Sequence, residues 1–130
     1  MGHMIGIDLG TTNTAVCAMI GGRPKMIKNK KGYTVFPSAV FENSSGKIIV
    51  GRQAKTAMMT EPDRGVFAVK RLLGRRFDSE EVSQIRKQVP YEIKAATDGS
   101  CLVQMAGNWY TPVDIAAFIL KEARLSLIHI

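Results

Sequence analysis

The 130-residue sequence predicts a mixed α/β fold in which short antiparallel strands alternate with amphipathic helices. Three observations support this prediction. Apolar residues alternate with polar or small ones in several segments, as they do in half-buried strands. Turn signals such as Gly21-Gly22 and Asp98-Gly99 separate these segments. Other stretches instead place apolar residues three or four positions apart, which is the spacing of a helix face.

Strands are predicted where the alternating segments lie between turn residues. Near the N-terminus, two strands meet across a turn at residues 10–13, and Gly21 with Gly22 forms a tight turn into a third. The predicted strands span residues 4–9, 14–20, 24–28, 33–41, 47–50, 91–96, 101–105 and 108–111. The first three are expected to be antiparallel, and the last three are expected to form a meander.

Helices are predicted for residues 52–59, 66–73 and 78–88 and for a segment that begins near Pro112. Asp78, with Glu81 three residues later, resembles a capping box for the third of these helices. Thr111, Pro112 and Asp114 supply a cap, a first-turn proline and an acid for the last. The apolar face of that helix is predicted to carry Val113, Ala116, Ala117, Leu120 and Ala123.

Composition indicates one soluble domain at most, with 45% hydrophobic and 22% charged residues. No apolar run is long enough to span a membrane, and the N-terminus has no signal-peptide pattern, so a cytoplasmic protein without a membrane partner is expected. Cys17 and Cys101 lack a Cys-x-x-Cys partner and are expected to be small buried residues. His3 and His129 lie at the chain ends, which argues against histidine-based catalysis.

The net charge of +7 favours a different class, a basic nucleic-acid-binding module without enzymatic activity. Two basic clusters carry this alternative, one at residues 23–31 and one at residues 70–76. However, only 7% of the residues are aromatic, and neither cluster has the interleaved aromatic side chains of a stacking platform. We therefore expect no nucleic-acid partner and keep this class as the alternative.

The turn at residues 10–13 has the chemistry of a phosphate clamp. Gly10 can take a positive φ and lets backbone N–H groups approach an anion, and Thr11, Thr12 and Asn13 add side-chain donors. Asp8 ends an otherwise apolar strand, where an ionised carboxylate needs a partner such as hydrated Mg²⁺. An ordinary hairpin with Asp8 capping its turn explains the pattern about equally well.

Longer strings of the sequence favour a phosphate clamp over an ordinary hairpin at this turn. The string from Gly6 to Asn13 resembles the first phosphate motif of the 70-kilodalton heat-shock protein chaperones, the bacterial DnaK type in particular. Phe36 to Ser38 resembles the family's threonine-proline-serine stretch, with Phe36 in place of threonine. Val50 to Lys55 is similar to its helix entry, and Phe67 to Phe77 to a string specific to the family. The resemblance extends to about Arg124.

This resemblance implies an actin-like, ribonuclease-H-like ATPase fold and a fragment of its first lobe. Residues 1–34 would begin the core subdomain with the phosphate-binding hairpin, residues 35–111 would form an inserted smaller subdomain, and residues 112–124 the return helix. Residues 125–130 depart from the family's lysine-rich helix and are expected to be a non-native tail. In related folds the strand at residues 4–9 lies inside the sheet, so we expect an open edge that self-associates or is covered by the tail.

The resemblance also implies a function. The parent chaperone would bind ATP with Mg²⁺ and hydrolyse it to ADP and phosphate. It would couple this cycle to the binding and folding of unfolded polypeptides during the stress response. Its partners would be these clients, a J-domain co-chaperone and a nucleotide-exchange factor. The fragment itself is expected to be inactive.

Site residues follow from the matched positions only. Asp8 would hold Mg²⁺ through water, and the turn from Gly10 through Thr11 and Thr12 to Asn13 would contact the β- and γ-phosphates. Lys70 would be the catalytic residue that reaches the γ-phosphate and the attacking water, and Arg71 would lie near the cleft. Without the resemblance, Lys70 would be interpreted as a solvated side chain on a helix.

Overall fold

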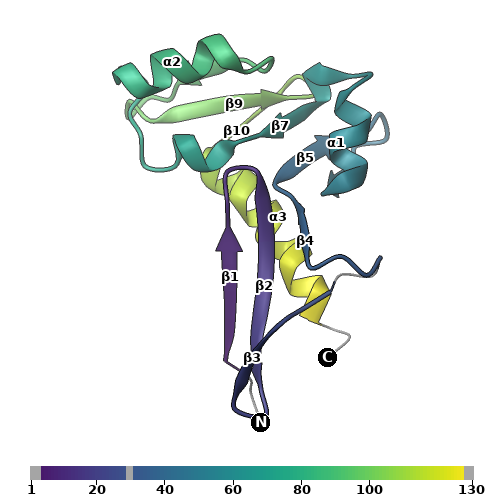
Figure 1. Cartoon of the computed structure of the whole chain (residues 1–130). Helices are drawn as coiled ribbons and strands as arrows, with labels where there is room; N and C mark the ends of the chain where they lie inside the picture. Colours follow the sequence, from purple (N-terminus) through teal and green to yellow (C-terminus); the bar gives the residue numbers. More distant parts are fainter. Residues whose placement is uncertain (1–3, 29–30, 128–130) are drawn as a thin grey trace.

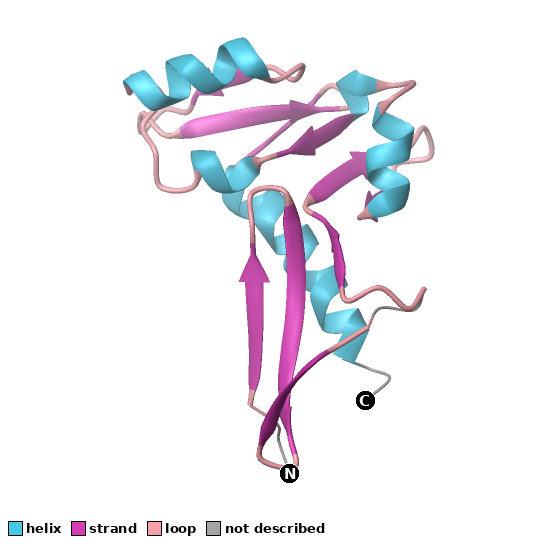
Figure 2. Cartoon of the chain, in the orientation of Figure 1, coloured by secondary structure: helices cyan, strands magenta, loops and turns pink. Residues whose placement is uncertain are grey.

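The computed structural model describes residues 4–28 and 31–127 (Figure 1). The two histidines and the last three residues of the expected tail therefore lie outside the described residues. The described residues form three small antiparallel sheets that share one long helix. Figure 2 shows that this helix passes behind the N-terminal hairpin and reaches up to the other two sheets.

The first sheet confirms the predicted N-terminal strands. Strand β2 (Asn13–Ile20) pairs with β1 (Ile5–Leu9) on one side and with β3 (Arg23–Met26) on the other, and β4 (Val35–Pro37) also pairs with β2. All of these pairings are antiparallel. The short turns between β1, β2 and β3 lie where the glycine and threonine pattern predicted them.

The other two sheets have three strands each. In one, β5 (Ala39–Glu42) lies between β6 (Ile48–Val50) and β7 (Gly65–Phe67). In the other, β9 (Cys101–Met105) lies between β8 (Ile93–Ala95) and β10 (Asn108–Tyr110), which confirms the predicted meander. The chain changes sheet between β4 and β5, at Ser38.

The predicted helix at residues 66–73 is wrong. Its first part is strand β7, in which Val66 pairs with Val40, and its second part is the short 3₁₀ helix η2 (Val69–Leu72). Ala68 separates them with a left-handed φ of 58°. The apolar pattern misled because Val66, Val69 and Leu72 are all buried although they belong to two different elements.

The remaining helices agree with their predicted positions. They are α1 (Arg52–Met58), α2 (Glu80–Gln88) and α3 (Pro112–Ser126), whereas the one-turn 3₁₀ helix η1 (Pro62–Arg64) lies where no helix was predicted. In α3 the capping box of Thr111 and Asp114 is confirmed, with both hydrogen bonds at 3.0 Å. The helix includes Leu125 and Ser126, so the first two residues of the expected tail are helical.

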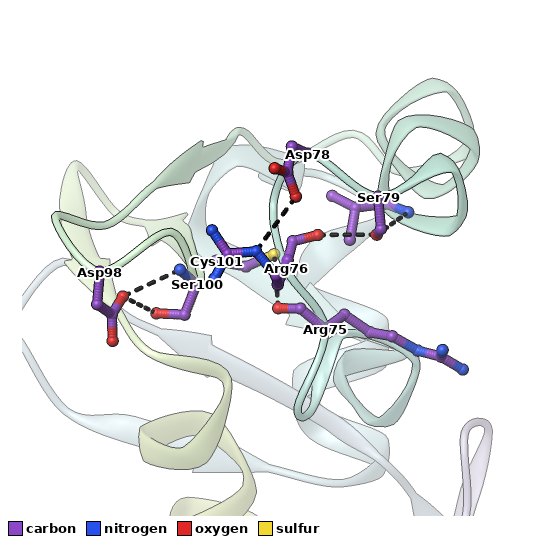
Figure 3. Close-up of polar contacts among 8 residues, drawn as sticks. Arg75, Arg76, Asp78, Ser79, Asp98, Ser100 and Cys101 are labelled. Atoms are coloured by element: carbon purple, nitrogen blue, oxygen red, sulfur yellow. Dashed lines mark hydrogen bonds and ion pairs between the residues drawn. The ribbon is translucent and has the colours of Figure 1, made fainter.

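The cap of α2 differs from the prediction. Ser79, not Asp78, caps the helix, because its hydroxyl accepts a hydrogen bond from the amide of Val82 (Figure 3). Asp78 instead forms an exposed ion pair with Arg76 at 3.4 Å.

Nearby, the thiol of Cys101 donates to the carbonyl of Arg75, and burial raises the pKa of this thiol. Cys101 is therefore the small buried residue expected, whereas Cys17 is only half-buried.

The buried face of α3 also differs from the prediction. Ile115, Ile119 and Ala123 are fully buried and Ala116 nearly so, whereas Val113 is 65% and Leu120 is 41% exposed. Helix α3 contacts η2 and strands of all three sheets, so its most apolar side chains face that shared core. The prediction of a helix was correct, but it placed the buried face about one residue away from where that face lies in the structure.

A carboxylate ties the second sheet to the third. Tyr110 donates from its hydroxyl to Glu42 at 2.5 Å, and the side-chain amide of Asn108 donates to the same carboxylate at 3.3 Å. Arg64 donates to the backbone carbonyls of Glu42 and Asn43. The hydrogen bond to Glu42, together with burial, raises the pKa of Tyr110 to about 12.

We predict that Tyr110→Phe lowers the free energy of unfolding by about 1 kcal/mol at neutral pH, because it removes a hydrogen bond to a charged acceptor. The raised pKa means that the native state holds the phenolic proton more tightly than the unfolded chain, whose tyrosine titrates near 10. The contribution is fully present below about pH 10 and is lost as pH rises toward about 12.

Urea unfolding of the wild type and of Tyr110→Phe from pH 8 to 12 measures this difference, and Glu42→Gln should reduce it. Subtracting the variant's curve removes the contribution of other tyrosines, including Tyr91, whose pKa is also raised by burial. Parallel curves for the two proteins across this range would contradict the assignment.

Candidate functional site

The turn between β1 and β2 is closed by a short backbone hydrogen bond. The amide of Gly10 donates to the carbonyl of Asn13 at 3.0 Å, and Thr11 and Thr12 form the end of the loop. A Cβ atom at position 10 would lie 2.4 Å from that carbonyl oxygen. The φ of Gly10 is not left-handed, so glycine is required here because of this close approach and not for the positive φ that the sequence suggested.

Ser38 fastens the turn to the second sheet. Its amide donates to the carbonyl of Thr12 at 2.8 Å, and its hydroxyl shares a buried hydrogen bond of 2.8 Å with the hydroxyl of Thr14. Thr14 and Ser38 are both buried, so these polar groups satisfy each other where water does not reach. The threonine turn is thereby held at a fixed position relative to β5 and its neighbours.

The turn borders a groove of about 490 Å³. Thr11 and Thr12 line it, and so do the cationic residues Lys55 and Arg71. The complete lining consists of Thr11, Thr12, Pro37, Ser38, Ala39, Lys55, Met58, Met59, Phe67, Ala68 and Arg71. The groove thus combines hydroxyl donors and two positive charges with an apolar wall.

Arg71, which lines this groove, is anchored by helix α2. Its guanidinium donates to the side-chain carbonyl of Gln88, the last residue of α2, at 3.0 Å. Burial raises the pKa of the Tyr91 hydroxyl, and the charge of Arg71 opposes this increase only in part. Tyr91 in turn donates to the carbonyl of Phe67 at 2.7 Å, which fixes the backbone just before η2.

Other predicted site residues lie near the turn or near Arg71 without lining the groove. Asp8 is exposed on β1 opposite Ala15 and forms no ion pair with the residues that the structure describes. Its charge is therefore solvated, and the argument that burial demands a partner does not apply. Asn13 begins β2 with an exposed side chain, and Lys70 is exposed on η2 next to Arg71.

Sequence reasoning missed Lys55 and Ser38 as members of the site. Both lie inside strings that resemble family motifs, but both are far from the threonine turn in the sequence. Lys55 is on the last turn of α1, and only the packing of α1 beside β5 and β7 brings it to the threonine turn.

The donor set fits a hydrated magnesium ion better than a directly bound metal. Within residues 4–28 and 31–127, no three histidine, cysteine, aspartate or glutamate side chains form a metal-binding group. A single exposed carboxylate two residues before the threonine turn suits an ion that keeps most of its waters. In the same part of the chain, no helix is long and apolar enough to cross a membrane.

The fold and this site define a mixed α/β domain whose hydroxyl-rich turn meets a cationic groove, an arrangement suited to anionic ligands. The family model described as Hsp70 protein matches residues 4–126, and the chain therefore belongs to the Hsp70 family. Members of this family are ATPases and chaperones that bind ATP or ADP with Mg²⁺, unfolded clients and co-chaperones. The match gives no support to the nucleic-acid-binding alternative.

We predict that Gly10→Ala lowers the free energy of unfolding by about 1 to 3 kcal/mol, because the added methyl group collides with the Asn13 carbonyl and must distort the turn. Urea unfolding measures the loss. Gly6→Ala is the matched control on the same hairpin, since a Cβ there would meet nothing within 4 Å. Equal stability of the two variants would show that the turn is not as tight as described.

Proposed function

We propose that the threonine turn and its groove form part of the phosphate-binding site of a DnaK-type Hsp70 with an actin-like, ribonuclease-H-like ATPase fold. The observation that carries this proposal is the groove itself, in which the hydroxyl-bearing turn lies with Lys55 and Arg71. Polyphosphates are recognised by such combinations of backbone amides, hydroxyl groups and cations.

Each predicted residue has a role in this proposal. The turn from Gly10 to Asn13 binds the β- and γ-phosphates through its amides and side chains, and Asp8 holds Mg²⁺ through water. When bound, the metal neutralises charge on the phosphates. The hydrogen bonds of Ser38 keep the turn from moving, so its donors need little reorganisation when the anion arrives.

Lys70 is the proposed catalytic residue and Arg71 a phosphate-binding one. Phosphoryl transfer develops charge on the γ-phosphoryl oxygens, and positioned cations and donors supply most of the stabilisation. Arg71 lines the groove, and Lys70 precedes it on η2 with an exposed ammonium group that is available to a ligand. Lys55 joins this set as a further cation.

The wider proposal concerns the whole chaperone. We propose residues 1–34 and 112–124 as parts of a core subdomain, residues 35–111 as a smaller inserted one and residues 125–130 as a tail. The chain changes sheet at Ser38, a few residues after this boundary, because β4 still pairs with β2. The protein would act in the cytoplasm, with a J-domain co-chaperone and a nucleotide-exchange factor, and would use ATP hydrolysis to bind and fold unfolded polypeptides.

We predict that the 130-residue chain alone binds Mg-ATP with a dissociation constant of about 1 mM or weaker, because the polar residues that line the groove suit the phosphates and leave few contacts for the base. Titration followed by amide NMR should shift the signals of residues 10–13 and of Arg71. Lys55→Ala should weaken binding several-fold. Lys47→Ala, which removes the same charge from an exposed position outside the groove, should not.

Shifts centred on the basic strand β3 instead of the turn, or equal effects of the two lysine variants, would show non-specific attraction to the positive chain. Lys70→Ala should leave this binding largely unchanged. Introduced into a complete Hsp70 that contains this sequence, it should abolish turnover while nucleotide binding persists, and turnover at the wild-type rate would refute its catalytic role.

A further inference from the structure

Three residues that line the groove belong to one short segment, residues 67–71. Phe67 ends strand β7, Ala68 is the connection, and Arg71 lies in η2. Ala68 has a left-handed φ of 58°, a conformation that is unfavourable for a residue with a side chain and that persists only where the surroundings enforce it. The contacts that hold this segment therefore also determine where Arg71 lies.

Backbone hydrogen bonds hold the segment on both sides of Ala68. Phe67 pairs with Ala39 of β5, and the amide of Arg71 donates to the carbonyl of Ala68 at 3.2 Å. These bonds fix the strand and the 3₁₀ turn. They do not fix the guanidinium of Arg71, which stands at the end of a long side chain with several rotatable bonds.

The hydroxyl of Tyr91 adds a side-chain contact at the start of the segment. It donates to the carbonyl of Phe67 at 2.7 Å, immediately before Ala68. The rings of Tyr91 and Phe67 also pack edge to face, with their centroids 5.8 Å apart and their planes at 85°. Because Tyr91 is only 5% exposed, water does not readily replace this hydrogen bond when it is lost.

Gln88 holds the other end of the segment. Its Oε1 accepts a hydrogen bond from Nη1 of Arg71 at 3.0 Å. Helix α2 ends at Gln88 because Pro90 disfavours a helical conformation at Val89, whose φ of −112° and ψ of 147° are extended. The short connection between α2 and β8 therefore supplies both Gln88 and Tyr91 to the segment that lines the groove.

The hydrogen bond to Gln88 leaves most donors of Arg71 for a ligand. A guanidinium has five N–H donors in a planar fork, and this is the one side-chain hydrogen bond of Arg71 among the residues that the structure describes. Both side chains are exposed, so the guanidinium stays accessible. Its Nε and Nη2 atoms form an edge that can donate two parallel hydrogen bonds to one phosphate.

We propose that Gln88 and Tyr91 are positioning residues for phosphate binding in the groove. Gln88 orients the guanidinium, and Tyr91 fixes the backbone that carries it, so Arg71 meets a phosphate group of a polyphosphate through its Nε–Nη2 edge. A guanidinium that is already held loses less conformational freedom when the anion binds. The inference rests on the proposed function and gives a role in it to two residues outside the lining of the groove.

Arg71→Lys separates the shape of this cation from its charge. Lysine keeps the positive charge but presents its donors from one nitrogen, which cannot bond to Gln88 and also offer a planar two-donor edge. We therefore expect Arg71→Lys to weaken the binding of inorganic tripolyphosphate at fixed ionic strength. Unchanged affinity would show that charge alone matters at this position, and it would overturn the proposed geometry.

NMR titration of the 130-residue chain with inorganic tripolyphosphate tests the role of Gln88. The Nε–H signal of Arg71 should shift, and Gln88→Ala should weaken binding by about threefold because Arg71 is no longer held before the anion arrives. Gln84→Ala is the matched control, since Gln84 is an exposed glutamine of the same helix outside the groove.

The result distinguishes a failure of this inference from a failure of the proposed function. Equal affinities for Gln88→Ala and Gln84→Ala, with the Arg71 signal still shifting in the wild type, would overturn the positioning role and leave the proposed function standing. A wild-type Arg71 signal that tripolyphosphate does not move would contradict the proposed function and this inference with it.

Tyr91→Phe tests the second positioning residue, because it keeps the ring and removes only the hydroxyl. Tyr110→Phe is its control, since it also removes a hydrogen-bonded hydroxyl, from a residue that does not line the groove. Both variants should lose stability in urea, but only Tyr91→Phe should weaken tripolyphosphate binding several-fold and speed amide exchange at residues 68–71. Equal affinities for the two folded variants would show that Tyr91 supports stability alone and would overturn its positioning role.

Discussion

The buried hydrogen bonds of Ser38 hold the candidate site together. The threonine turn belongs to the first sheet, whereas the chain enters the second sheet only at β5, and α1 packs beside β5 and β7. Ser38 bonds to Thr12 through its amide and to Thr14 through its hydroxyl at the point where the chain changes sheet. Because a buried hydroxyl left without a partner is costly, these bonds favour one relative position of the two sheets.

Helix α3 completes this arrangement from the other side. Its buried residues contact all three sheets, and its capping box starts it directly after β10. Glu42 adds a polar link through Tyr110 between the second and third sheets. Several elements, each fixed by its own contacts, therefore surround the groove beside the turn. This arrangement suits a site whose donors must be positioned before the ligand binds.

Local signals predicted most of the fold. Alternating apolar residues and two-residue turns gave the hairpin and the meander, and the Thr111 capping box gave the start of α3, because these features depend on neighbouring residues only. The prediction was wrong for Val66 to Leu73, because pairing with β5 overrides the helical pattern there. It also misplaced the buried face of α3, because contacts with three sheets determine which side of that helix is buried. In the groove, only Thr11 and Thr12 come from the turn that the sequence singled out, whereas Lys55 and Ser38 reach that turn through tertiary packing.

A double-mutant cycle on the buried hydroxyl pair tests the central claim most directly. Thr14→Val, Ser38→Ala and the double variant are compared with the wild type by urea unfolding, with amide exchange of residues 10–13 as a second readout. If the Ser38 bonds fix the turn, the coupling energy should be about 1 kcal/mol, and either single variant should speed exchange in the turn. Additive effects, with exchange in the turn unchanged, would contradict the account.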